Sequence, residues 1–195
     1  MTLHRSEPTT HLSTLQLYLE TATKLLSMIL QIPPIDPSTS LRTSYLLHLS
    51  NDVLSSVVGY QPTPQNVVDL LDWLDDLDQA WLAVLQSQIW DPKEGVGTEL
   101  GEEALNGTKS SPLNQTEKTR LRSLLLGGVE TFEEWVYGGA DGTSQEQRDD
   151  TLESMGLHQA FDQVFSRTLD ELGGLGGLTL EAISLKEDDC AIDFA

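Results

Sequence analysis

The chain has little of what secreted and membrane-spanning proteins contain. It has a single cysteine, Cys190, which excludes a framework of internal disulfides. The longest apolar run near the start, residues 25–32, is broken by two polar residues and is far shorter than the roughly 20 residues that span a bilayer. Residues 1–10 lack the basic and apolar regions of a signal peptide. We therefore expect a cytoplasmic or nuclear protein.

Basic residues are also scarce. The chain carries 11 Lys and Arg against 31 Asp and Glu, a formal net charge of −20. Such a charge repels phosphate backbones and anionic lipid, so we expect neither nucleic acid nor a membrane as a direct partner. Only four acidic and three basic residues lie in residues 1–60, so almost all of the acidic excess falls in residues 61–195. This distribution favours a heavily packed first third and a remainder whose acids lie on outward helix faces, a loop and a tail.

Signals for β-strands are weak, because no segment alternates polar and apolar residues between hairpin turns. Apolar residues instead recur at helical spacing in five segments, at about 8–31, 38–58, 64–85, 114–137 and 143–172. The second segment places Leu41 and Tyr45 on its apolar stripe. The third is the clearest, with Thr63 as a cap and Pro64 at the first helical position. The pattern predicts an all-α protein, an irregular bundle of about five helices over residues 8–172.

Glycine marks three interruptions. Residues 91–113 are rich in Gly, Pro, Ser and acidic residues, which predicts a long, flexible acidic loop. Residues 173–195 start as a Gly-rich hinge and continue as an acidic tail with scattered apolar residues, loose when alone. Gly127 and Gly128 fall inside the fourth segment. They indicate a kink, a close helix–helix approach, or a division into two shorter helices.

No catalytic or cofactor signature is present. The four histidines have no i, i+4 pair, and the Gly-rich segments miss the spacings that bind phosphate groups. Asp72, Asp75 and Asp76 share one face of the third segment, and such a face could hold Mg²⁺. A solvated acidic face is the commoner arrangement, and we favour it. We expect no enzyme activity, no bound metal and no cofactor.

One acidic residue of the third segment, Asp78, projects into its apolar arc. A carboxylate there is costly unless it is paired. Either it anchors a basic residue of a partner or, as we favour, it pairs inside the domain with Arg42, Arg120 or Arg122 or lies at the edge of the buried stripe.

The four tryptophans lie on or beside the apolar stripes. Trp81 and Trp135 are predicted core residues. Trp73, at the edge of the arc, and Trp90, at the helix end, are candidate interface anchors, because aromatic side chains dominate interface hot spots. Ordinary packing is the commoner role for such residues.

These observations predict a non-catalytic protein–protein interaction subunit or adaptor of a multi-protein complex. The alternative is an acidic chaperone or mimic that shields a basic client such as a histone or ribosomal protein. Apolar residues in the tail could dock in a groove and fold on binding. The candidate partner-binding residues are Trp73, Asp78, Trp90, Ile183, Leu185, Ile192 and Phe194.

Overall fold

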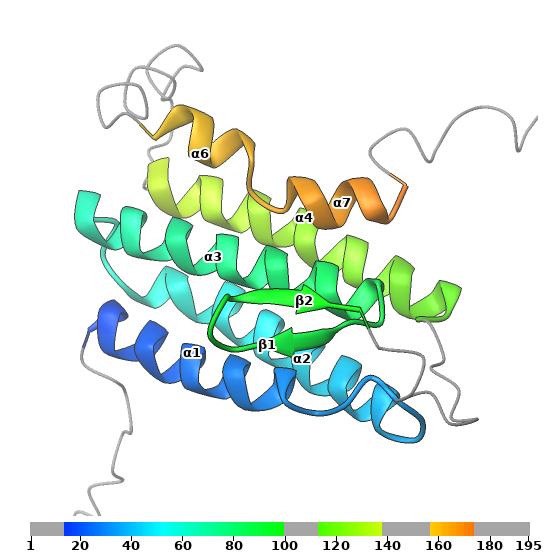
Figure 1. The fold of residues 1–195 in the computed structure, drawn as a ribbon. Coiled ribbons are helices and arrows are strands. Elements are labelled where there is room, and N and C mark those ends of the chain that lie inside the picture. Colours follow the sequence, from blue (N-terminus) through cyan, green and yellow to red (C-terminus); the bar gives the residue numbers. More distant parts are fainter. Residues whose placement is uncertain (1–13, 100–112, 138–156, 174–195) are drawn as a thin grey trace, which may run out of the picture.

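Helices dominate the computed structural model, which describes residues 14–99, 113–137 and 157–173 (Figure 1). The predicted all-α bundle is confirmed. No helix within these ranges is long and apolar enough to cross a membrane. The elements are α1 (Leu15–Leu30), α2 (Ser38–Ser56), the 3-10 helix η1 (Val57–Gly59), α3 (Pro64–Leu85), α4 (Gln115–Tyr137), α6 (His158–Asp162) and α7 (Ser166–Glu171).

The starts of the two longest helices are specified by their own first turns. Thr63 Oγ1 accepts a hydrogen bond from the Asn66 N–H at 3.3 Å, and Pro64 begins α3, as predicted. Before α4, Asn114 Oδ1 accepts from the Glu117 N–H, and Glu117 Oε2 accepts from the Asn114 N–H, both at 2.9 Å. This reciprocal capping box satisfies N–H groups that have no acceptor within the helix.

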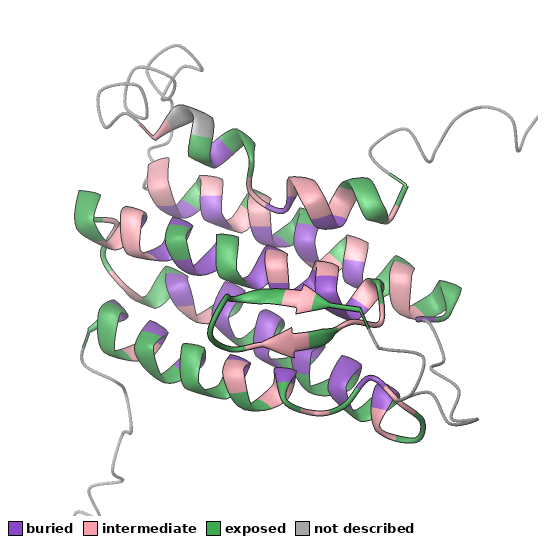
Figure 2. Ribbon diagram, viewed as in Figure 1, coloured by how far each residue is buried: buried purple, intermediate pink, exposed green. Residues whose placement is uncertain are grey.

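The central element of the bundle is α3. It packs against α1, α2 and α7, while α2 also packs against α1 and α4 (Figure 1). Leu77 and Trp81 on α3 are fully buried. Buried residues concentrate on the faces that the helices turn towards one another (Figure 2). The apolar residues of α3 are therefore those of a helix with neighbours on several sides.

Two tryptophans confirm the predicted core and satisfy their polar atoms inside it. Trp81 Nε1 donates to Ser50 Oγ on α2 at 3.0 Å. Trp135 is 6% exposed, and its Nε1 donates to the Tyr60 carbonyl oxygen at 2.7 Å. Each indole thus buries its apolar surface without leaving its N–H unpaired.

A small β-hairpin lies where the sequence predicted an irregular loop. Strands β1 (Ile89–Asp91) and β2 (Val96–Thr98) pair antiparallel, with Trp90 opposite Gly97, and pack on α3. Gly97 permits the close approach of β2 to α3, because a Cβ there would lie 2.8 Å from Ala83 Cβ on α3. Three-residue strands are too short to show an alternating pattern in the sequence. Residues 100–112 of the expected loop lie outside the described ranges.

The fifth predicted segment is not one continuous helix in its described part. Helices α6 and α7 are separated at Phe165, whose backbone is left-handed, with φ of +57°. That conformation is unfavourable for a bulky residue, so the surrounding packing must hold it. The Phe165 side chain is 1% exposed. Residues 8–13 of the first predicted segment, 143–156 of the fifth, and the tail from 174 onward lie outside the described ranges.

Helix α4 passes unbroken through Gly127 and Gly128. A Cβ at Gly128 would lie 2.6 Å from Leu54 Cδ1 on α2, whereas a Cβ at Gly127 would meet nothing within 4 Å. Of the three predicted explanations for this glycine pair, the close helix–helix approach is confirmed.

The glycine pair yields opposite predictions for neighbouring positions. Gly127→Ala should raise the free energy of unfolding by about 0.5–1 kcal/mol, because alanine favours helix and the site is open. Gly128→Val should lower it by about 1–3 kcal/mol, because the new side chain would push Leu54 out of its packing. Urea unfolding of both variants measures this. Equal effects at the two positions would contradict the close approach.

Candidate protein-interaction site

The buried carboxylate of Asp78 is satisfied within the domain. It is 1% exposed on α3, and its Oδ2 accepts from Arg167 Nε at 3.0 Å. Its Oδ1 accepts from the Thr168 N–H at 2.9 Å, while Thr168 Oγ1 donates to the Asp78 carbonyl oxygen at 3.1 Å. Asp78 is thus paired inside the domain, but with Arg167 at the start of α7 rather than with the three arginines suggested by the sequence.

An acidic pocket of about 440 Å³ adjoins these contacts of Asp78, between α3 and the α6–α7 segment. Asp72, Asp75 and Asp76 line it from α3. Burial and the neighbouring charges of Asp75 and Asp72 raise the pKa of Asp76 above its ordinary value. Asp75 also pairs with Arg167. Desolvation acts to lower the pKa of Arg167, but its bonds to Asp78 and Asp75 and their charges raise it overall.

No group of three or more His, Cys, Asp or Glu side chains is placed to hold a metal ion within the described part of the chain. Asp72, Asp75 and Asp76 thus form an acidic face of α3, and of these three Asp75 is paired with Arg167. This face offers negative charge to a basic surface but no closed set of ligands.

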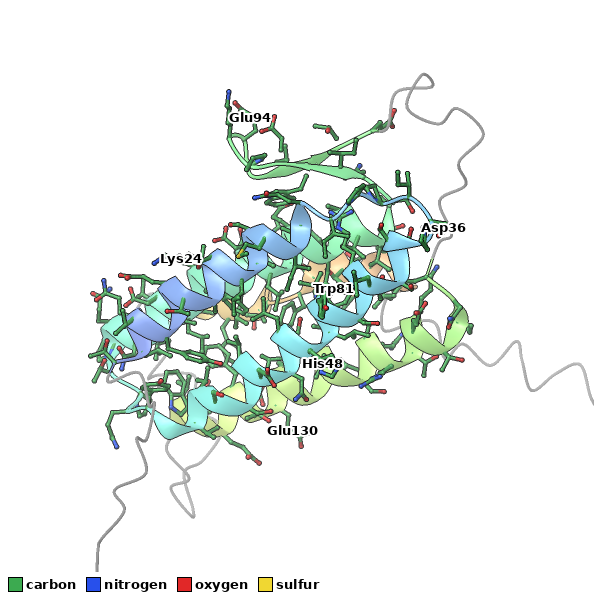
Figure 3. The ribbon with its side chains drawn as sticks, turned by 90° about the horizontal axis from the view of Figure 1, so that it is seen from below. Lys24, Asp36, His48, Trp81, Glu94 and Glu130 are labelled. Atoms are coloured by element: carbon green, nitrogen blue, oxygen red, sulfur yellow. The ribbon has the colours of Figure 1, made fainter. Side chains whose placement is uncertain are left out.

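A second pocket, the α1–α2 groove, is apolar. We use this name for the space of about 360 Å³ lined by Leu25, Met28, Ile29, Ile32, Tyr45, Leu49 and Asp52. Its residues on α1 and just beyond it follow i, i+3, i+4, i+7 spacing and form a row distinct from the buried row of that helix. Met28 in this row is 66% exposed. Helices α1 and α2 lie side by side in the view of Figure 3.

The α2 side of the groove supplies an aromatic ring and one carboxylate. Tyr45 and Asp52 lie two turns apart, and Tyr45 is 49% exposed. The first two helices run antiparallel around residues 31–37, which places Asp52 towards the Leu25 end of the groove and Tyr45 towards Ile32. Lys24 lies on the side of α1 turned away from α2 (Figure 3). The charge that lines this groove is therefore negative.

Sequence reasoning missed this groove. It placed Leu41 and Tyr45 on the buried stripe of the second segment, but Leu41 is 46% exposed, similar to Tyr45. Both residues have helical spacing relative to true core residues, and spacing alone does not separate a buried row from an exposed neighbouring row.

The predicted partner-binding residues fall into three environments. Trp73 is 3% exposed, and Asp78 is enclosed as described, so the domain itself covers both. Trp90 is half-buried on β1, between the exposed Ile89 and the turn. The four candidates in the tail, Ile183, Leu185, Ile192 and Phe194, lie outside the described ranges.

Another buried charge lies beneath the hairpin. Arg42 on α2 is 1% exposed, and its Nη1 donates to the Gln88 carbonyl oxygen at 2.7 Å. Burial lowers the pKa of Arg42 to about 10. Its Nε and Nη2 have no hydrogen-bond partner. Arg42 thus ties α2 to the segment leading into β1 and is not the partner of Asp78.

Comparison with known proteins gives one family. A family model with the description "TFB6: Subunit 11 of the general transcription factor TFIIH" matches residues 19–127, more than half of the chain. The matched region includes the whole α1–α2 groove and ends inside α4, before α6 and α7. No curated protein and no solved structure gives a significant match.

The buried hydrogen bonds of Asp78 should contribute far more to the free energy of unfolding than the exposed bond of Asp75 to the same arginine. Asp78→Ala should lower the free energy of unfolding by about 2–3 kcal/mol, because it leaves the Thr168 N–H and Arg167 without their buried acceptor. Asp75→Ala removes an exposed bond to the same arginine and should cost under about 1 kcal/mol. Chemical denaturation of the two variants tests this difference. Similar losses would show that α7 does not depend on the buried carboxylate.

The raised pKa of Asp76 predicts a pH-dependent stability. Folding disfavours the charged form, so the cost is full above the folded-state pKa and disappears as pH falls below the unfolded value. Asp76→Asn should therefore stabilise the fold at pH 7 by a few tenths of a kcal/mol, since the site is partly exposed. The gain should be absent at pH 3. Glu130→Gln on α4 is the charge-matched control, and an equal gain there would indicate a net-charge effect only.

Proposed function

The chain belongs to the TFB6 family, described as subunit 11 of the general transcription factor TFIIH, and from this membership we propose that it is a non-catalytic protein-binding subunit that works in the nucleus. The family match is the observation that carries the proposal. It covers α1 from Leu19 onward, α2, α3, the hairpin and the first part of α4, and therefore most of the described helical core. The function we assign is to hold other proteins in a multi-protein assembly.

The surface supports a role based on contact. Exposed large apolar side chains come together at the α1–α2 groove, among them Leu25, Met28 and Tyr45, and a contiguous apolar patch of this kind marks an interaction surface. The hairpin adds Ile89 and Val96, 41% and 42% exposed, beside the half-buried Trp90. We retain Trp90 and the four apolar residues of the tail as proposed contacts, whereas Trp73 and Asp78 serve the domain's own packing.

The acidic excess fits the same role. A strongly negative molecule is attracted to basic surfaces over long range, which speeds association and makes it salt-sensitive. The comparison with known families gives no support to the alternative of an acidic chaperone for histones or ribosomal proteins. We therefore assign the charge to solubility and to steering a partner.

The proposal predicts co-purification with a defined assembly. The tagged full chain, expressed at its natural level and recovered from nuclear extract, should bring down TFIIH subunits in mass spectrometry and sediment with them as a large species. A tag-only sample is the control for background. A chain that sediments alone and enriches no TFIIH subunit over this control would contradict the assignment.

A further inference from the structure

The α1–α2 groove is an apolar pocket whose outer side chains, Leu25 and Met28, stay exposed in the domain. Its α1 row repeats at i, i+3, i+4 and i+7 and ends one residue past the C-cap, while α2 offers Tyr45, Leu49 and Asp52 at i, i+4 and i+7. Leu49 is nearly buried and forms part of the floor, whereas Met28 and Leu25 are 66% and 47% exposed and form one wall. Two parallel rows of side chains over about two helical turns outline a trough.

A helix fits such a trough better than an extended strand. The groove has two helices as walls and no free strand edge, so it offers side chains and not backbone hydrogen bonds to a ligand. An extended peptide gains most of its affinity from backbone pairing, whereas an amphipathic helix binds by laying anchors at i, i+3, i+4 and i+7 into an apolar groove. A guest helix would also meet the flexible thioether of Met28, which adapts its shape to neighbouring side chains.

Charge then distinguishes among the occupants. Asp52 is the one charged residue that lines the groove, at its Leu25 end. No ion pair is seen for it within the described ranges. A guest with a lysine or arginine next to its apolar face would bury its anchors and pair with this carboxylate. A guest of negative charge would place like charges together at the same point.

This charge disfavours the two occupants that the chain itself could supply. The tail from residue 174 onward has one basic residue, Lys186, against five acidic ones, Glu181, Glu187, Asp188, Asp189 and Asp193, so its docking would bring a net negative charge to Asp52. A second copy would carry the same carboxylate and a net charge of −20. The complementary occupant is a foreign helix with a basic flank.

We propose that the α1–α2 groove receives an amphipathic helix of a partner protein, with its apolar side chains between α1 and α2 and a lysine or arginine beside Asp52. This inference rests on the proposed function, because it identifies the surface through which the subunit holds a partner. The groove lies wholly inside the region that matches the family model.

Three synthetic 18-residue peptides test the chemistry against the full chain. The first has leucines along one helical face and lysines elsewhere. The second replaces every lysine with glutamate. The third has the composition of the first in a scrambled order without an apolar face. Binding is followed by anisotropy of a labelled peptide and by amide shifts of the ¹⁵N-labelled protein. The first peptide should bind and shift amides of α1 and α2. Equal binding of the second or the third would overturn the proposal.

Matched variants locate the site. Met28→Glu should weaken the first peptide at least about tenfold, because it removes an apolar anchor from the contact. Val58→Glu is the control, since Val58 is also exposed, at 52%, but does not line the groove.

Asp52→Asn should weaken binding about twofold to fivefold and reduce its salt dependence, whereas Asp72→Asn on α3 should not. Equal effects within either pair would show that the peptide binds elsewhere or by charge alone.

A cysteine variant tests the other occupants. Cys190 is the single natural cysteine, so Met28→Cys creates a chain with one thiol in the groove and one in the tail. Under mild oxidation the proposal expects no preferred disulfide. A monomer closed by a bond between residues 28 and 190 would identify the tail as the occupant. A cross-linked dimer, together with a wild-type dimer in light scattering that Met28→Glu abolishes, would identify a second copy. Either result would overturn the proposal.

Recovery from nuclear extract separates this inference from the proposed function. If the wild-type chain recovers no TFIIH subunits, the proposed function fails. If it recovers them and Met28→Glu recovers them as well as Val58→Glu does, the function stands and the groove assignment fails. Loss of a subunit with Met28→Glu, but not with Val58→Glu, supports both.

Discussion

The fold depends on the neutralisation of one carboxylate in the middle of its central helix. α3 packs against α1, α2, α7 and the hairpin, and Asp78 lies on its covered side, at 1% exposed. An unpaired carboxylate there would cost several kcal/mol, so the domain closes only when a donor reaches it. α7 supplies that donor twice, through the Arg167 guanidinium and the Thr168 backbone N–H. The charge therefore selects the position and direction in which the last described helix packs.

Local chemistry made much of this architecture predictable. Helical spacing located the long helices, and the Thr63 and Asn114 caps located two of their starts. The partner of Asp78 was not predictable in the same way, because Arg167 lies 89 residues away in sequence and no local rule links them. The same limit applies to Arg42, whose bond to Gln88 depends on how α2 meets the end of α3. The α1–α2 groove escaped notice because exposed and buried apolar rows share one periodicity.

The acidic residues of α3 are concentrated on the side of the helix that faces away from the core. On α3, Asp72, Asp75 and Asp76 gather opposite the core, and burial together with the charges of Asp75 and Asp72 raises the pKa of Asp76. One favourable contact, from Arg167, partly relieves them. Such a concentration opposes folding slightly, and the core of α3 must offset it. A surface that retains mutual repulsion favours any partner that brings positive charge, because binding then removes a strain that folding alone leaves in place.

The weakly charged first third now has a physical explanation beyond packing. Its interior is packed, with Leu46 and Val53 fully buried, yet its outside carries Met28, at 66% the most exposed large apolar side chain in the described ranges. A solvent face on α1 would be expected to carry the charges that fill the solvent face of α3. Charge is instead sparse where α1 and α2 meet solvent together. This depletion is typical of the centre of an interface, whereas a merely stable domain would gain solubility from more charge there. The distribution of charge and the shape of the groove thus support the same conclusion from independent properties.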